Sequence, residues 1–230
     1  MSQDLLRTSC IELIESLVAD KVITGTDLAR FALNDKDKAN PEYVRQEMER
    51  WYRTLGIEYI TQQPFNLSLP PYTSEELREA YIHNEIIICV PKGITRSQLG
   101  ALLRVDCWAL NDDLVSEGKE VEDFWFTTQL SDIPAGLNKT AVQTREELER
   151  AGKLGMTLNR YMVFVARMRH ETGKTPDLGY WVWLTRSQYD QRGILVAGFD
   201  SKAKFSVHGW LPSFQGARCG YRFVTHPDHL

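Results

Sequence analysis

The stretch GYWVWLTRSQYDQRGILVAGFDSKAKFSVHGW, residues 179–210, contains short apolar and aromatic runs separated by turn residues. The runs at residues 180–184, 194–199 and 204–208 have the length of strands, and a further run follows at residues 219–224. Short runs rich in β-branched and aromatic residues, bounded by Gly, Asp, Ser and Asn, are typical of strands. The last third of the chain is therefore predicted to be a β meander.

The first of these runs divides its side chains between two faces of the predicted sheet. Because successive side chains of a strand point to opposite sides, Tyr180, Val182 and Leu184 are expected to fill a core. Trp181 and Trp183 then share the other face and need cover. That cover is either a further layer of the same domain or a ligand that uses the rings as anchors. The sequence leaves both open.

A helix is predicted directly before the meander, at residues 156–172. Its apolar side chains recur at three-to-four spacing, and Gly173 suits the left-handed residue that ends many helices. Three further helix starts are predicted from capping-box spacings, in which a hydroxyl precedes a Glu or Gln by three residues. These pairs are Thr73 with Glu76, Thr95 with Gln98, and Thr144 with Glu147.

Two strands are predicted nearer the middle of the chain. Residues 85–90 form a β-branched run that ends at the turn residues Pro91, Lys92 and Gly93. Residues 123–129 contain a Phe-Trp-Phe triplet. Both segments have the composition of buried strands. With the helices between them, they predict an α+β fold.

The first 70 residues are predicted to form a helical N-terminal segment. Helices are expected at residues 5–18, from Thr26 or Asp27 to residue 33, and from an Asn40 cap to Gly56. Residues 62–72 hold three prolines and little periodicity, which indicates a linker or an extended arm. The predicted organisation is a helical segment at residues 1–70 and a ligand-binding domain at residues 71–230.

Composition narrows the classes of function. The chain has 230 residues, of which 43% are hydrophobic, and a formal net charge of −4. This net charge disfavours general binding of nucleic acid. No apolar run approaches the roughly 20 residues that span a bilayer, and the N-terminus does not resemble a signal peptide. We therefore expect a cytoplasmic protein that does not bind nucleic acid or membrane.

The chain lacks the motifs that carry a built-in mechanism or hold a cofactor, such as GxGxxG, GxxxxGK[ST], HExxH and GxSxG. Its four cysteines, at positions 10, 89, 107 and 219, are far apart in sequence and lack histidines at zinc-ligand spacing. Free thiols are expected, with no cofactor and no metal site. The chain is accordingly predicted not to be an enzyme.

Two alternatives remain open. A hydrolase would bring His208, Asp200 and His170 together in one cleft, within hydrogen-bond reach of one another. A regulator would instead use the N-terminal helices to bind nucleic acid, although the third predicted helix carries several acids where a recognition helix needs cations.

The loop at residues 209–218 mixes aromatic residues, small polar residues, glycines and an arginine, which is the composition of an adaptable binding surface. Residues 174–230 contain seven Lys or Arg and four Asp or Glu, so an acidic or polar partner suits this region. The residues expected to line a ligand-binding surface are Trp181, Trp183, Ser206, His208, Trp210, Ser213, Phe214, Gln215, Arg218 and Tyr221.

The order of these elements resembles the end of a C-type-lectin-like domain. The resemblance rests on the helix at residues 156–170, on residues 172–174, 179–184, 198–200 and 207–210, and on the closing segment at residues 216–224. More narrowly, the pattern is similar to the formylglycine-generating-enzyme type of that fold, as found in variable proteins of diversity-generating retroelements.

This resemblance implies a stable scaffold that displays a diversified surface for a protein or other macromolecular ligand. The enzyme branch of the family uses a cysteine pair near the C-terminus, whereas Cys219 stands alone in that region of this chain. Oxidase activity is therefore not implied.

Overall fold

The structure is a computed structural model that describes Ser16, residues 39–117 and residues 120–226. The chain divides into two compact units, residues 1–38 and residues 39–230. The helices predicted at residues 5–18 and 26–33, and Cys10, lie outside the described residues except for Ser16, which is helical. The predicted boundary at residue 70 lies inside the second unit.

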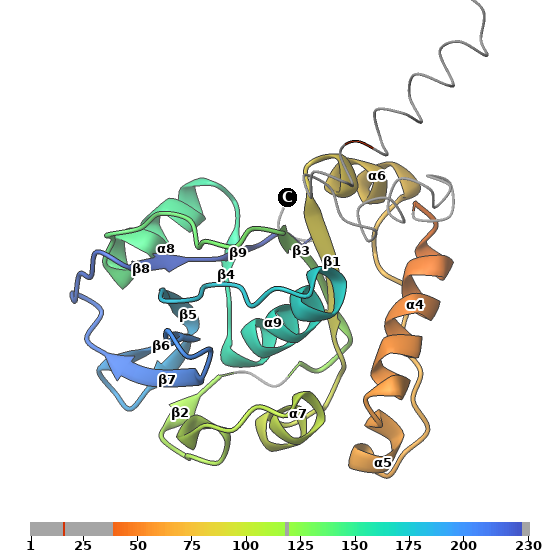
Figure 1. The fold of residues 1–230 in the computed structure, drawn as a ribbon, viewed down its shortest axis with the longest axis horizontal. Coiled ribbons are helices and arrows are strands. Elements are labelled where there is room, and N and C mark those ends of the chain that lie inside the picture. The colour runs from red at the N-terminus through yellow and green to blue at the C-terminus, as the bar shows by residue number, and fades with distance from the viewer. Residues whose placement is uncertain (1–15, 17–38, 118–119, 227–230) are drawn as a thin grey trace, which may run out of the picture. The chain divides into compact units, whose positions relative to one another are not determined.

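The second unit is a mixed structure of helices and strands, as predicted for an α+β protein (Figure 1). Its helices are α4 (Pro41–Thr54), α5 (Ile57–Thr61), α6 (Ser74–Ile82), α7 (Arg96–Leu103), α8 (Ala141–Arg150) and α9 (Leu158–Thr172), with a 3-10 turn η1 (Trp108–Leu110). Its strands are β1 (Glu85–Val90), β2 (Val115–Ser116), β3 (Phe124–Gln129), β4 (Leu154–Gly155), β5 (Trp181–Tyr189), β6 (Gly193–Phe199), β7 (Phe205–Trp210), β8 (Cys219–Tyr221) and β9 (Phe223–Val224).

The predicted β meander is confirmed for its first three strands, which form an antiparallel sheet, but the run predicted at residues 219–224 does not continue it. Strands β5, β6 and β7 follow one another in sequence and in space, and β2 pairs with the far end of β5. Strand β8 returns to lie parallel to the start of β5, at Trp181 to Trp183. Strands β1 and β3 form a separate antiparallel pair, and β4 pairs with β9. The strands predicted at residues 85–90 and 123–129 are thus also confirmed.

Helix α9 forms the centre of the unit, between the β1–β3 pair and the β5–β6–β7 sheet (Figure 1). Nearly all of its residues from Leu158 to Met168 are buried, which makes it a helix that is covered all round rather than on one face. Side chains of β5 and β6 that face α9, such as Val182 and Leu195, are fully buried in the same core.

Local signals place most helix ends as predicted. Thr73 with Glu76 and Thr95 with Gln98 form complete capping boxes at α6 and α7, and the Asn40 side chain accepts from the Glu42 N–H at the start of α4. Gly173 ends α9 with a φ of 70°, in the left-handed region that glycine adopts without strain.

The helix start predicted at Thr144 is wrong. Helix α8 begins four residues earlier, where Thr140 and Gln143 form the capping box. Thr144 lies inside the helix, and its side chain is fully buried. Both pairs have the required spacing, so the pattern alone does not separate them, and packing against the neighbouring strands decides which hydroxyl is the cap.

The residues before and after position 70 pack into the same core. The Tyr52 hydroxyl in α4 donates to the carbonyl of Cys89 in β1 over 2.7 Å. Within the predicted linker, Phe65 and Leu67 are buried, and the Leu67 N–H donates to the Glu49 carboxylate. Residues 62–72 are therefore an extended arm that packs along the unit.

A buried ion pair links the segment after α9 to the residues between β8 and β9. The Asp177 carboxylate accepts two hydrogen bonds from the Arg222 guanidinium, at 2.7 and 3.0 Å, and one from the Tyr161 hydroxyl at 2.9 Å. Arg222 also donates to the carbonyls of Gln129 and Ser131. The pair is enclosed, with Asp177 fully buried, and the carboxylate is well supplied with donors.

Candidate functional site

The register of the sheet brings five predicted site residues onto one face. Trp181 in β5 pairs with Gly198 in β6, which pairs with Ser206 in β7. Two residues further along β5, Trp183 pairs with Val196, which pairs with His208. Trp210 lies opposite Ile194 further along β7. Since side chains opposite each other in a sheet point to the same side, all of these side chains share the face turned away from α9.

The rings on this face contact one another in a continuous cluster. The Trp181 ring centroid lies 5.0 Å from that of His208 and 5.4 Å from that of Trp210. Trp210 also contacts Trp183 at 5.8 Å and Phe214 at 4.6 Å. We call these five side chains the aromatic face. Their separations are typical of favourable aromatic pairs.

The two tryptophans of β5 have different cover. Trp183 is fully buried in a small core with Ala141, Val196 and Cys219, and its indole N–H donates to the Lys139 carbonyl over 2.9 Å. Helix α8 and the segment before it therefore supply the further layer that the sequence left open. Trp183 is thus the buried member of the aromatic face, whereas Trp181 is half-buried.

The loop after β7 is held in place by hydrogen bonds to the segment that covers Trp183. The Pro212 carbonyl accepts from the Ala141 N–H over 3.0 Å, and the Gln215 side chain donates to the Asn138 carbonyl over 2.7 Å. Within the loop, the Phe214 N–H donates to the Leu211 carbonyl. The loop is thus fixed before any ligand arrives, which lowers the entropic cost of binding.

Apolar side chains around this loop are open to solvent. Phe214 is 46% exposed, Leu211 61% and Val142, at the start of α8, 47%. Sequence reasoning did not include Leu211 or Val142 in the site. Leu211 lies within the predicted loop and was detectable there, whereas Val142 is remote in sequence and reaches the site only through the contact of α8 with Pro212.

The remaining predicted residues lie at the margins of the aromatic face. Ser213, Gln215 and Arg218 are exposed. Tyr221 is buried on β8, where burial and a hydrogen bond with Glu147 raise its pKa to about 12. Tyr221 is thus part of the support rather than the surface.

Two observations weigh against chemistry at this face. Burial raises the pKa of the Cys219 thiol to about 12, so it is not an activated nucleophile. The residues of the hydrolase alternative are also not brought together: His170 contacts Trp51 from the last turn of α9, and His208 lies on the opposite side of the sheet from α9. The Asp200 carboxylate accepts from backbone N–H groups within its own hairpin.

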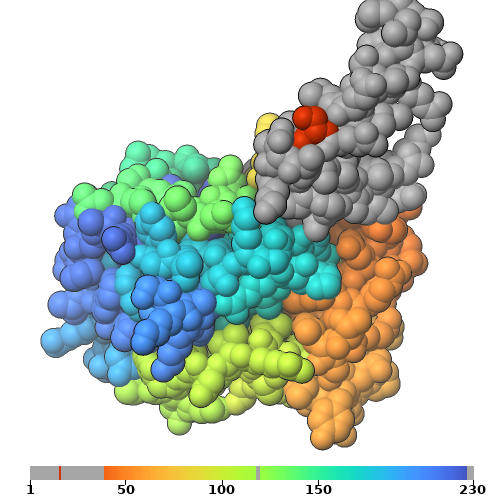
Figure 2. Space-filling view, viewed as in Figure 1, coloured from red at the N-terminus to blue at the C-terminus, as the bar shows by residue number. Residues whose placement is uncertain are grey.

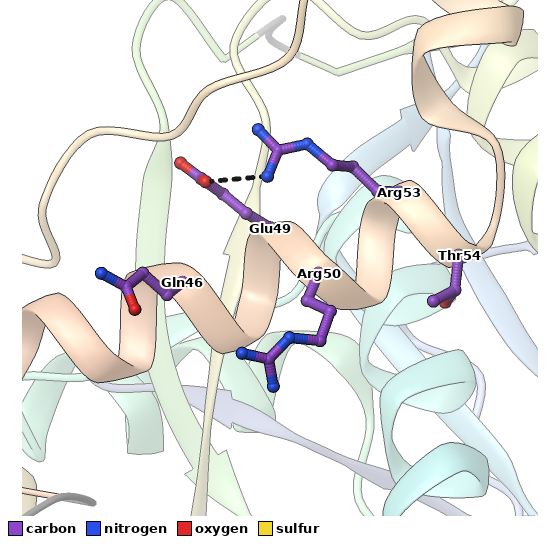
Figure 3. A pocket seen from close by; sticks show the side chains of 5 residues that line it. All are labelled: Gln46, Glu49, Arg50, Arg53 and Thr54. Atoms are coloured by element: carbon purple, nitrogen blue, oxygen red, sulfur yellow. Dashed lines mark hydrogen bonds and ion pairs between the residues drawn. The ribbon is translucent and has the colours of Figure 1, made fainter.

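A separate cavity of about 510 Å³ lies along α4 and is lined by Gln46, Glu49, Arg50, Arg53 and Thr54 (Figure 3). None of the predicted site residues is among them. Its carboxylate, Glu49, is already engaged by Arg45, Arg53 and the Leu67 N–H. The cavity therefore offers no free catalytic acid or base.

Within the described part of the chain, no three His, Cys, Asp or Glu side chains gather as a metal site would require. The cysteines described there, Cys89, Cys107 and Cys219, are free, as predicted. None of the described helices combines the length and apolar character needed to cross a membrane.

Comparison with known proteins gives no match, since no family model, no curated protein and no solved structure is similar to the chain. The aromatic face itself therefore carries the functional conclusion. It lies among the C-terminal strands, which form the blue surface on the opposite side of the unit from the orange surface of α4 (Figure 2).

Proposed function

We propose that the chain is a binding protein that captures a macromolecular ligand on the aromatic face and does not catalyse a reaction. The observation that carries this proposal is the contact chain from Trp181 and His208 through Trp210 to Phe214, which ends at a ring that is 46% exposed. Exposed aromatic rings that are packed in place are the side chains that most often dominate binding energy at protein interfaces.

The construction of the face supports this role. Trp183 is fully buried within it, and hydrogen bonds hold the loop of Phe214 to residues 138–142. Little order has to be imposed on Trp210 or Phe214 when a ligand binds, because their positions are already restricted. A rigid platform with open apolar side chains suits recognition of a partner better than it suits proton transfer.

We further propose a C-type-lectin-like scaffold of the kind used by variable proteins of diversity-generating retroelements. The supporting features are the helix α9 before the sheet, the β5–β6–β7 meander, and the return of β8 beside the start of β5. On this proposal, sequences of relatives vary at Ser206, His208 and Ser213 while the buried support stays constant. Constant residues at those three positions contradict diversification.

We also propose that the protein acts in the cytoplasm, and the three free cysteines of the described residues are consistent with that compartment.

The proposed function is tested by site-specific photo-cross-linking in cells that produce the protein. A photoreactive phenylalanine analogue replaces Phe214 in one variant and Tyr59 in α5 in the control, since Tyr59 is also exposed, at 79%. We expect a discrete cross-linked product from position 214 that is absent from position 59. The proposal fails if both positions yield the same products, or if position 214 yields none.

A further inference from the structure

The aromatic face has positive charge at one end. Trp181, Gly198 and Ser206 form the last row of paired residues on this face before the hairpin that joins β6 to β7. Lys202 and Lys204 belong to that hairpin and are exposed. Lys204 directly precedes β7, and Lys202 lies in the turn two residues before it.

Arg218 lies at the same end of the sheet. Its carbonyl accepts a hydrogen bond from the Trp181 N–H over 2.9 Å, and its side chain is exposed. Among the described residues, neither Arg218 nor the two hairpin lysines forms an ion pair with a carboxylate. These three cations are therefore available to a ligand.

Asp200 lies in the same hairpin and is an anion. Its carboxylate accepts from the backbone N–H groups of Lys204 and Lys202, at 2.9 and 2.8 Å, and these hydrogen bonds lower its pKa, as do the charges of Lys202 and Lys204. At the margin formed by α8, Glu147 is paired with Lys139. Lys202, Lys204 and Arg218 therefore outnumber Asp200 at the end of the face near Trp181.

We propose that the ligand of the aromatic face is an acidic peptide segment that also carries apolar side chains. Its apolar side chains pack on Trp181, Trp210 and Phe214, and its carboxylates approach Lys202, Lys204 and Arg218. This inference rests on the proposed function and adds the chemistry of the partner. Charges at the edge of an interface act mainly on association rate and on partner choice, so the apolar contacts supply most of the affinity.

The test uses two bead-displayed libraries of 12-residue peptides and the full chain. The libraries share the same randomised apolar positions, and the remaining positions are Asp or Glu in one library and Lys or Arg in the other. We expect binding peptides from the acidic library alone. Affinities of the selected peptides are then measured by fluorescence polarisation.

Three variants separate the inference from the proposed function. Lys202→Glu/Lys204→Glu reverses two cations beside the aromatic face, and Arg50→Glu/Arg78→Glu reverses two exposed cations on α4 and α6 as a control of equal charge. Phe214→Ser removes the exposed ring.

We expect Lys202→Glu/Lys204→Glu to weaken binding about tenfold in roughly 50 mM salt and about threefold at high salt, because ions screen exposed charges. The control should bind within about twofold of the wild type, and Phe214→Ser about tenfold more weakly.

The outcomes are distinct. If the selected peptides are basic, or if Lys202→Glu/Lys204→Glu binds as the wild type does while Phe214→Ser is impaired, the acidic partner is rejected and the binding face stands. If neither change affects the selected peptides, the aromatic face is not their site and the proposed function fails too. If neither library yields a binder, a peptide segment is rejected as the ligand, and the cross-linking result at position 214 alone decides the proposed function.

Discussion

The two faces of the β5–β6–β7 sheet differ in how completely the protein covers them. The face toward α9 is closed, with Val182, Leu195 and Phe199 all buried. On the opposite face Trp183, Val196 and Ile194 are buried with Ala141 of α8, whereas Trp181 and Trp210 are only half-buried. Both faces contain large apolar side chains, so hydrophobicity does not distinguish the structural face from the candidate binding face. The position of the covering helix distinguishes the two faces.

The largest expected effect lies on the closed side, at the Asp177–Arg222 pair. Asp177→Ala leaves a buried guanidinium without its carboxylate, and we expect it to lower the free energy of unfolding by about 3–5 kcal/mol. Asp132→Ala is the matched control, since Asp132 forms an exposed pair with Lys174, and should cost less than about 1 kcal/mol. Urea denaturation followed by circular dichroism measures both. Equal losses contradict the role assigned to the buried pair.

A matched pair of valines compares the two faces directly. Val182 faces α9 and Val196 lies beneath the aromatic face, and both are fully buried. We expect Val182→Ala to lower the free energy of unfolding by about 2–3 kcal/mol. We expect Val196→Ala to lower it by about 1 kcal/mol, because the half-buried rings of Trp181 and Trp210 pack against its cluster and can shift into the cavity. Equal losses in urea denaturation show that both faces are packed equally well.

A third test concerns the start of α9, where the closed side contains a buried carboxylate. Glu117 Oε2 accepts from the Leu158 N–H over 2.9 Å and from the Ser187 hydroxyl over 2.5 Å, and burial raises the pKa of Glu117 above 4.5. The folded state therefore binds more protons than the unfolded state between 4.5 and the raised pKa. The contribution of Glu117 to stability falls as pH rises through that window.

Glu117→Gln removes this titration. We expect the free energy of unfolding of the variant to gain on that of the wild type as the pH rises above about 4.5, in urea titrations between roughly pH 4 and pH 8. Glu122→Gln changes an exposed side chain and is the control. A difference between Glu117→Gln and the wild type that is independent of pH contradicts the assignment.

The smallest effect on stability is expected at the open end of the aromatic face. Leu211→Ser replaces an exposed side chain and should change the free energy of unfolding by less than about 0.5 kcal/mol. Phe214→Ser also loses the contact with Trp210 and should lower it by about 0.5–1 kcal/mol. The same substitutions should strongly reduce capture of a ligand. A large loss of stability from either one shows that the ring is part of the core, as Trp183 is.

The comparison of faces also shows what sequence could predict. Strand alternation correctly placed Val182 and Leu184 in the core and Trp181 and Trp183 together on the other face, because this pattern depends only on backbone geometry. It was wrong for Tyr180, which precedes β5 and is only half-buried. Capping boxes located α6 and α7 for the same local reason. The interpretation failed at Thr144, where two local signals competed.

The different cover of Trp181 and Trp183 could not be predicted. Both are tryptophans of one strand, and only the approach of residues 138–142 buries Trp183. That approach joins segments about forty residues apart in sequence, and no local pattern encodes it. The same contact brings the exposed Val142 beside the loop, and no local pattern predicts that either.

The attachment of the loop after β7 has a consequence for how this protein tolerates change. Most of the hydrogen bonds that hold the loop join backbone atoms: Pro212 to Ala141, Phe214 to Leu211, and Cys219 to both Gly216 and Asn138. A substitution at Ser213, Phe214 or Arg218 leaves those backbone partners in place. The outline of the loop is thus independent of the side chains that it displays. One backbone can present many different chemistries at this position, and a library built there should yield new binders from an unchanged fold.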